Sequence, residues 1–123
     1  MHIWLSILLF FGTATVFSEN DQYNPNPNLA CLHRPLKQNE SAAAHRTLPC
    51  GTILTVFNPR TGLHTDTIVK DRGPYGRYKT GEYKSDLDIT PAVAKKIKHN
   101  GMEPVIFLIK ERHYKVRKRA PNS

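Results

Sequence analysis

Turn-forming residues interrupt this chain so often that only short strands and short helices fit between them. The sequence holds 9 prolines and 7 glycines among its 123 residues. The segment TILTVFN (52–58) alternates apolar and polar residues, PRTG (59–62) is typical of a turn, and LHTDTIVKD (63–71) predicts a returning strand. These three segments together predict a β-hairpin.

The segment after the hairpin, RGPYGRYKTGEYKS (72–85), contains three glycines and one proline and predicts a long loop. DLDI (86–89) then predicts a short strand, and EPVIFLIK (103–110) predicts a strand buried on both sides. Between them a short helix is expected, with Thr90 as its N-cap and Gly101 as its stop. Many short strands with one short helix predict an all-β fold, a small closed β-barrel.

The N-terminal region reads as an export signal. Residues 3–17 carry no charge and are rich in Leu, Ile and Phe, but the run is short for a membrane span and ends in small residues. We therefore assign 1–18 to a cleaved signal peptide, with an uncleaved anchor as the alternative. Residues 19–28 are assigned to a flexible leader, 29–110 to one barrel domain, and 111–123 to a basic tail.

Export sets expectations for the two cysteines and for the charge. In an oxidising compartment Cys31 and Cys50 are expected to form a disulfide. The formal net charge of +8 suits an anionic polymer such as an acidic wall glycan, a lipid surface or a nucleic acid. The histidines lack metal-ligand spacing, and no nucleotide-binding, hydrolase or nucleic-acid motif is found.

Four titratable residues lie beside turns and are candidates for acid–base chemistry: His45, Asp71, Asp86 and Asp88. A carboxylic acid that is partly buried at the mouth of a barrel can donate a proton near neutral pH. Each residue also has a structural interpretation. Asp71 can cap the turn that follows it, His45 can be a core histidine, and Asp88 can favour the start of the helix. The tyrosines of the long loop can stack on sugar rings or pin the loop.

Four motifs in order carry a resemblance to a known family. AAAHRTLPCGT (42–52), TVFNPRTG, VKDRGPY and DLDITPAVAKKI strongly resemble the rare lipoprotein A family of double-psi β-barrel domains, over about residues 40 to 108. The domain is also similar to barwin and expansin. Two features depart from the family pattern. The opening strand SWYG is missing or degraded, with NPNLACLH in its place, and the glutamate expected shortly before the histidine is missing from ACLHRPLKQNE, where Glu40 is the nearest carboxylate.

The resemblance implies a six-stranded double-psi barrel with one or two short helices. It further implies an exported endolytic lytic transglycosylase that cleaves between N-acetylmuramic acid and N-acetylglucosamine in peptidoglycan and leaves 1,6-anhydro-muramoyl ends. Asp71 is then the catalytic acid and base, and His45 its essential partner. No cofactor or metal is implied. Weaker candidates for substrate contact are Arg72, Tyr75 and Asp88.

The same resemblance sets the expected partners and location. The partner is the peptidoglycan glycan strand, not nucleic acid. The protein is expected to be a monomer in the periplasm or outside the cell, associated with the wall and without a stable membrane anchor after signal cleavage. The alternative function is that of a non-catalytic, expansin-like protein that binds wall polysaccharide. A secreted basic toxin or inhibitor on the same scaffold is a third, weaker option.

Overall fold

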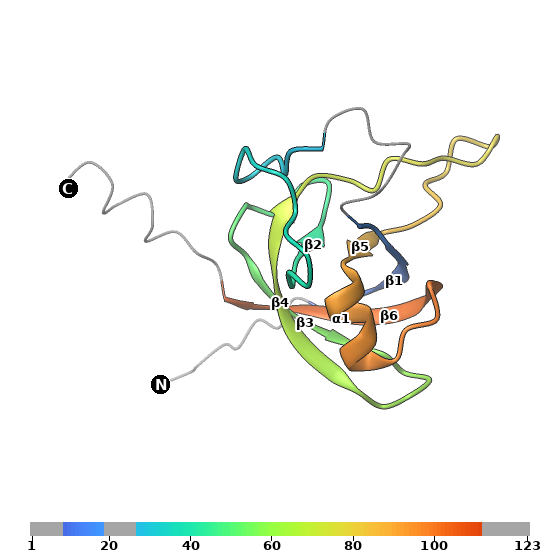
Figure 1. Ribbon diagram of the computed structural model, residues 1–123. Helices are drawn as coiled ribbons and strands as arrows, with labels where there is room; N and C mark the ends of the chain where they lie inside the picture. The colour runs from blue at the N-terminus through green and yellow to red at the C-terminus, as the bar shows by residue number, and fades with distance from the viewer. Residues whose placement is uncertain (1–8, 19–26, 112–123) are drawn as a thin grey trace, which may run out of the picture.

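Six strands close into a barrel that carries a single short helix (Figure 1). The computed structural model describes residues 9–18 and 27–111. Neighbouring strands follow the order β1-β5-β2-β4-β3-β6, with both parallel and antiparallel pairs. This confirms the predicted six-stranded barrel. The elements are β1 (Leu9–Val16), β2 (Ala43–Ala44), β3 (Ile53–Phe57), β4 (His64–Asp71), β5 (Leu87–Ile89), α1 (Pro91–Ile97) and β6 (Met102–Glu111).

The barrel begins at residue 9, within the segment that the sequence analysis assigned to the signal peptide. Strand β1 pairs antiparallel with β6 from Leu9 to Thr15 and parallel with β5 from Ala14 to Val16. Ala14 is fully buried. The barrel boundary at residue 29 is therefore wrong, and the opening strand, expected to be missing or degraded, is present as β1. Removal of residues 1–18 would take away β1.

Close packing of β1 against the start of β5 explains a glycine in this strand. A Cβ atom added to Gly12 would lie 2.4 Å from Oδ2 of Asp86, which is far inside van der Waals contact. The same Oδ2 atom accepts a hydrogen bond of 2.9 Å from the backbone N–H of Thr13. Gly12 thus allows the Asp86 carboxylate to reach the backbone of β1.

The predicted hairpin is confirmed, since β3 and β4 pair antiparallel from Ile53↔Ile68 to Phe57↔His64. Gly62 in its turn has a φ of +75°, a conformation that glycine adopts readily. Strand β6 differs from the expectation. Only alternate residues of β6 (Glu103, Val105 and Phe107) are buried, so this strand faces the core on one side.

Helix α1 starts where the sequence predicts but ends earlier. Its last residue is Ile97, and Lys98 takes the left-handed conformation with a φ of 52°. The N–H of Lys98 donates to the carbonyl oxygens of the preceding turn, so Lys98 rather than Gly101 ends the helix. Thr90 occupies the N-cap, but its hydroxyl accepts a hydrogen bond from the N–H of Ala42 instead of capping the helix.

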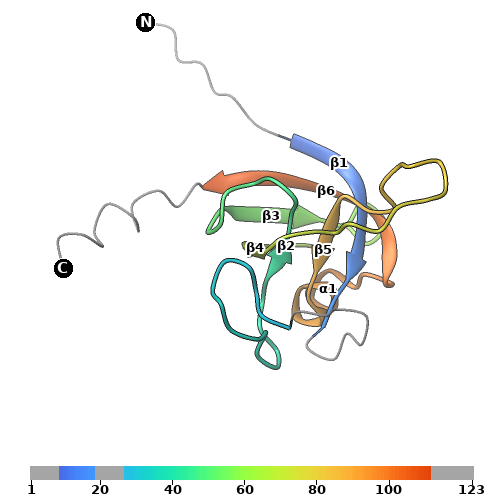
Figure 2. The same cartoon turned by 90° about the horizontal axis from the view of Figure 1, so that it is seen from above.

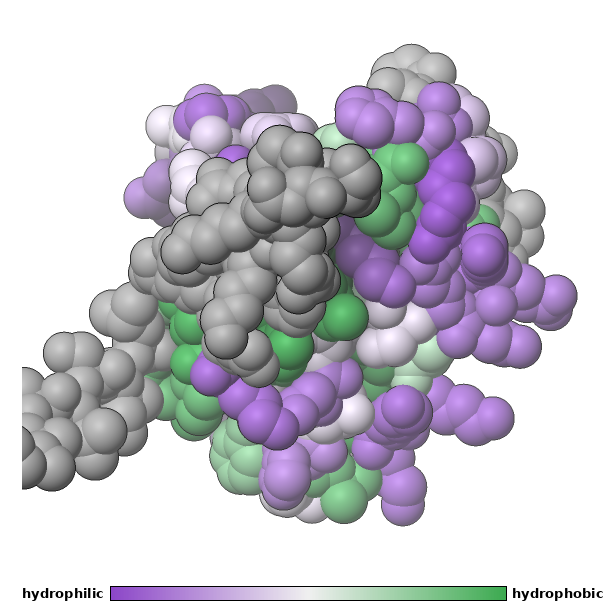
Figure 3. Space-filling view, turned by 90° about the vertical axis from the view of Figure 1, so that its left-hand side faces the viewer, coloured by the Kyte–Doolittle hydropathy of each residue, from purple (hydrophilic) through white to green (hydrophobic). Residues whose placement is uncertain are grey.

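The core fills the barrel with aliphatic side chains from every strand and from α1. On the face shown in Figure 3, hydrophilic residues cover much of the surface and apolar residues form smaller patches between them. Within residues 9–18 and 27–111, no helix is long and apolar enough to cross a membrane. The main core residues are Ala14, Ala43, Leu48, Leu54, Val56, Val69, Leu87, Ile89, Val93, Ala94, Ile97, Val105 and Phe107.

A buried polar network fixes the turn after β3 to the end of α1. The side-chain amide of Asn58, which is fully buried, donates to Glu103 Oε1 at 2.8 Å and to the carbonyl oxygen of Ile97 at 3.0 Å. Arg60 donates to the other oxygen of Glu103 at 2.8 Å. The Arg60 guanidinium, together with the Asn58 hydrogen bond, lowers the pKa of Glu103 from 4.5 to about 2.

Replacement of Glu103 by Gln should therefore lower stability in a pH-dependent way. We expect Glu103→Gln to reduce the free energy of unfolding by about 1–2 kcal/mol at pH 7, because the hydrogen bonds from Arg60 lose their charged acceptor. The folded pKa lies below the ordinary value of 4.5, so this contribution is complete above pH 4.5 and fades toward pH 2. Urea unfolding of both proteins at pH 7 and at pH 3 measures the difference.

The exposed Glu82→Gln serves as the matched control and should leave unfolding unchanged at both pH values. A Glu103→Gln effect that is as large at pH 3 as at pH 7 would contradict the assigned origin.

Candidate active site

Asp71 is the last residue of β4, and its neighbours hold it through both its main chain and its side chain. The carbonyl oxygen of Asp71 accepts a hydrogen bond of 3.2 Å from the backbone N–H of His45. Its Oδ1 atom accepts one of 2.8 Å from the backbone N–H of Ala30. The side chain is half-buried. A register shift between Ala43 and Ala44 adjoins this pairing, an irregularity of the kind that re-aims side chains near functional sites.

The strand register brings Asp71 and Asp88 into one line across the sheet. Ala44 on β2 lies opposite Asp71 on β4 and opposite Asp88 on β5. Ala44 is therefore the backbone neighbour of both acidic residues, and it is only 2% exposed. Two strand spacings separate their Cα atoms by roughly 10 Å.

Thr15 on β1 extends this line by one more strand. It lies opposite Asp88, and its hydroxyl donates to Asp88 Oδ1. We call Thr15, Asp88, Ala44 and Asp71 the carboxylate row. Thr15 was not among the residues predicted for the site, because it lies within 1–18, which had been assigned to a signal peptide. Its alternation with the buried Ala14 is the signal that could have revealed it.

The ring of His45 is engaged by its own turn and by aromatic neighbours. Its Nδ1 atom accepts hydrogen bonds from the backbone N–H groups of Thr47 at 3.1 Å and Leu48 at 3.0 Å. The ring lies edge-on to Phe107, with 6.0 Å between centroids, and tilted against Phe10, with 6.3 Å. Burial, followed by the nearby charges of two arginines, lowers the pKa of His45. The imidazole is therefore neutral at pH 7, with its proton on Nε2.

His45 and Asp71 are joined through the main chain, by the hydrogen bond from the His45 N–H to the Asp71 carbonyl oxygen. Among the described residues, no hydrogen bond joins the two side chains. The His45 ring instead accepts hydrogen bonds within its own turn.

Arg72 binds the same turn from the other side. Its guanidinium donates to the carbonyl oxygens of Leu48 and His45, the second at 3.1 Å, and lies 3.5 Å from the sulfur of Cys50. The Arg72 guanidinium, which was expected to contact substrate, therefore already donates hydrogen bonds to carbonyl oxygens of the chain. Tyr75, the other proposed contact residue in this loop, is 60% exposed.

The expected disulfide between Cys31 and Cys50 is present, with 5.7 Å between the Cα atoms. It lies close to the candidate acid. The N–H of Cys31 donates to the carbonyl oxygen of Lys70 at 3.1 Å, next to the hydrogen bond from Ala30 to Asp71. The disulfide thereby anchors the segment that supplies the hydrogen-bond donor to the Asp71 carboxylate.

Loss of this disulfide should lower stability substantially. We expect a Cys31→Ser/Cys50→Ser protein to lose about 3 kcal/mol of unfolding free energy, because the bridge closes a loop between residues that are 19 positions apart. Urea unfolding of the variant and of the oxidised parent measures this. The reduced parent is the matched control and should resemble the variant. An unchanged unfolding midpoint in both would contradict a stabilising role.

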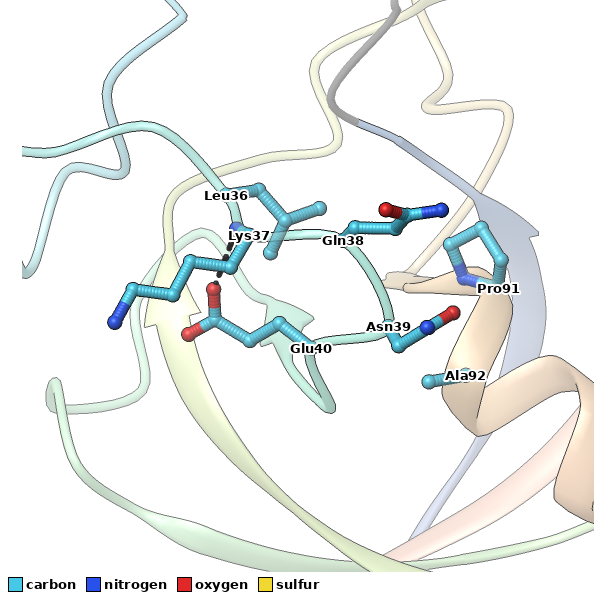
Figure 4. Close-up of a pocket in the computed structure, with 7 residues that line it drawn as sticks. All are labelled: Leu36, Lys37, Gln38, Asn39, Glu40, Pro91 and Ala92. Carbon is cyan, nitrogen blue, oxygen red and sulfur yellow. Dashed lines mark hydrogen bonds between the residues drawn. The ribbon is translucent and has the colours of Figure 1, made fainter.

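Glu40, the carboxylate nearest to the position of the missing family glutamate, is a structural anion. Its oxygens accept hydrogen bonds from Arg34 at 2.7 and 2.9 Å, from Lys70 Nζ at 2.8 Å and from the Lys37 N–H at 2.8 Å. The Arg34 guanidinium holds the pKa of Glu40 far below its usual range. Glu40 therefore cannot serve as a proton donor near neutral pH. Its ion pair with Lys70 joins the loop before β2 to β4. Figure 4 shows the hydrogen bond that Glu40 accepts from the Lys37 N–H.

Two surface pockets are separate from the carboxylate row. The first, about 160 Å³, lies between the Leu36–Glu40 segment and the start of α1 (Figure 4). The second, about 470 Å³, has Asp66 and two lysines in its lining. Neither lining includes Asp71, Asp88 or His45. Within the described ranges, no group of three His, Cys, Asp or Glu side chains could hold a metal ion.

Comparisons with known proteins place these features in context. No family model matches the chain. The chain is 45% identical over 60 residues to the "Probable endolytic peptidoglycan transglycosylase RlpA" of Aquifex aeolicus (strain VF5). The match covers 49% of this chain and 24% of that protein's length. The fold is similar to the crystal structure of cerato-platanin 3 from M. perniciosa, with a TM-score of 0.55 and 11% identity over 83% of this chain and 95% of that one.

Proposed function

We propose that this chain, whose sequence match and six-stranded barrel support an RlpA-like family, is an endolytic lytic transglycosylase of peptidoglycan glycan strands. The observation that carries the proposal is the carboxylate row, in which Asp71 and Asp88 flank the small Ala44. Both acidic residues are only partly buried, so solvent reaches each of them. The name of the Aquifex relative supplies the reaction class.

Asp71 acts first as an acid and then as a base. Its carboxyl proton passes to the oxygen that links N-acetylmuramic acid to N-acetylglucosamine, and the bond from that oxygen to C1 of the muramoyl residue breaks. The muramoyl 6-hydroxyl then attacks C1 and forms the 1,6-anhydro ring. The hydroxyl proton returns to the Asp71 carboxylate. No water is consumed, so a second carboxylate to activate water, as in inverting glycosidases, is not required.

The surrounding residues have distinct roles in this step. Oδ1 of Asp71 carries the hydrogen bond from Ala30, which leaves Oδ2 for the glycosidic oxygen. The Asp88 carboxylate, oriented by the hydroxyl of Thr15, stabilises the positive charge that develops on the sugar ring. His45 positions Asp71 through its backbone N–H.

The proposal includes export to the periplasm or the cell exterior, where peptidoglycan lies. The disulfide supports this, because disulfides persist in oxidising compartments. The net charge of +8 also suits a polymer that carries carboxylates. Because β1 belongs to the barrel, we place any cleavage of an export signal before β1 instead of after Ser18.

One observation favours a second function, the binding of wall polysaccharide without cleavage. The ring of His45 contacts Phe10 and Phe107, and it does not share a hydrogen bond with the Asp71 side chain. A site in which the histidine only supports the turn can hold a glycan without turnover.

Incubation with purified, peptide-stripped glycan strands in H₂¹⁸O separates the two functions. A transglycosylase yields 1,6-anhydro-muramoyl ends that mass spectrometry detects without ¹⁸O. A hydrolase yields reducing ends that carry ¹⁸O, which would contradict the proposed reaction. Retention of the strands without new ends would support the binding function.

A further inference from the structure

The loop between β4 and β5, residues 72–85, projects well beyond the barrel (Figures 1 and 2). It starts next to Asp71 and ends just before Asp86, so both of its ends lie beside the carboxylate row. From Tyr75 to Lys84 every residue is exposed. The barrel core does not use these side chains.

Hydrogen bonds within the loop give it a defined hairpin-like shape. The N–H of Tyr78 donates to the carbonyl oxygen of Glu82 at 2.8 Å. The N–H of Gly81 donates to the carbonyl oxygen of Tyr78 at 2.9 Å. The N–H of Lys84 donates to the carbonyl oxygen of Gly76 at 2.9 Å. A long exposed loop with this internal pairing is preorganised and loses little conformational freedom on binding.

Arg46, the residue after His45, braces the base of the loop. Its Nη1 atom donates to the carbonyl oxygens of Pro74 at 2.6 Å and Ser85 at 2.9 Å, one at each end of the loop. Its Nη2 atom lies 3.8 Å from Oδ1 of Asp86 and forms an ion pair with it. The loop is thus fixed to the same turn that positions Asp71.

The three loop tyrosines divide into two kinds. The ring of Tyr83 contacts two guanidinium groups, with the Cζ of Arg46 3.7 Å and that of Arg77 4.0 Å from its centroid. Through these cation–π contacts Tyr83 helps Arg46 to hold the two ends of the loop together. Tyr75 and Tyr78 are 60% and 50% exposed, so large parts of their rings face solvent.

Positive charge accompanies the two exposed rings. Between Tyr75 and Lys84 the loop carries Arg77, Lys79 and Lys84 against the single acid Glu82, and Lys84 Nζ lies 5.6 Å from the ring centroid of Tyr78. A pyranose ring offers an apolar face to an aromatic ring, and a carboxylate on the same sugar pairs with a nearby lysine. The loop therefore combines the two contacts that an acidic polysaccharide offers.

We propose that loop 72–85 is a binding arm for an acidic glycan strand that extends from the carboxylate row. Tyr75 and Tyr78 stack on sugar rings, while Lys79 and Lys84 pair with sugar carboxylates. The identification of the strand as peptidoglycan glycan rests on the proposed function. The arm itself rests on the geometry and charge of the loop.

Binding measurements in an Asp71→Asn background, where strands are not consumed, test the arm. Two double variants are compared with this parent, Tyr75→Ala/Tyr78→Ala and Lys79→Gln/Lys84→Gln. The probes are peptide-stripped glycan strands and the same strands with their carboxylates converted to amides. We expect the tyrosine variant to weaken binding of both probes by about three- to tenfold. The lysine variant should weaken binding of the native strands alone and reduce its salt dependence.

The matched control, Lys95→Gln/Lys96→Gln, removes two exposed charges from α1 and should bind like the parent. Unchanged binding of the glycan strands by both loop variants would overturn the proposal. So would a parent protein that does not bind the strands. Thermal unfolding of each variant must match that of the parent. If the protein with Asp71 intact forms no anhydro ends although the loop variants bind more weakly, the proposed reaction fails and the arm remains.

Discussion

An Asp71→Asn protein is expected to form 1,6-anhydro-muramoyl ends about 10²- to 10⁴-fold more slowly than the parent, because an amide can neither donate nor accept the proton in this step. The substitution preserves shape. The amide oxygen of Asn can still accept the hydrogen bond from the N–H of Ala30, so the loop anchored by the disulfide should stay in place. Quantitative mass spectrometry of anhydro ends over time measures the rate.

A second carboxylate on the same strand provides the control. Asp66 on β4 is exposed and pairs with Lys110 at 2.6 Å, away from the carboxylate row. Asp66→Asn should turn over glycan at the parent rate. Normal turnover by Asp71→Asn would show that another group transfers the proton, even if the barrel is as described.

A chain that begins at Glu19 is expected not to fold, whereas one that begins at Leu9 should fold like the full chain. Strand β1 forms seven register pairs with β6, from Leu9↔Leu108 to Thr15↔Met102, and three with β5. Without β1 the barrel cannot close, and β5 and β6 each lose a neighbour. The buried faces of Leu87, Ile89 and Val105 would then meet water.

Urea unfolding of the two shortened proteins provides the measurement. The chain from Leu9 should show a cooperative transition near the midpoint of the full chain, and the chain from Glu19 should show none. The N-terminal residue of the exported protein, read by intact mass, gives an independent check. A cooperative transition for the chain from Glu19, with its disulfide formed, would mean that β1 is dispensable.

Sequence patterns within short segments correctly predicted the hairpin strands and the start of the helix. The alternation in 52–58 and 63–71 located β3 and β4, and the Thr90-Pro91 pair located the start of α1. Strand β1 was missed because an apolar run at an N-terminus has the same composition whether it is a signal or a strand. What makes it a strand is its pairing with residues more than 70 positions away, and composition does not contain that information.

At the site too, the sequence predicted which residues are candidates but not how they are arranged in space. The motifs identified Asp71 and Asp88 as candidates, but their alignment through Ala44 is a consequence of strand register. The orientation of the His45 ring depends on Phe10, from β1, and on Phe107, from β6. Similarly, Lys98 rather than Gly101 ends α1, because a lysine there adopts the left-handed conformation and its N–H closes the last turn.

The methyl group of Ala44 has a consequence for how this surface tolerates change. It is only 2% exposed, so the space around it is already filled. A bulkier side chain at that position would have to push the neighbouring strands β4 and β5 aside, and it would displace Asp71 and Asp88 together.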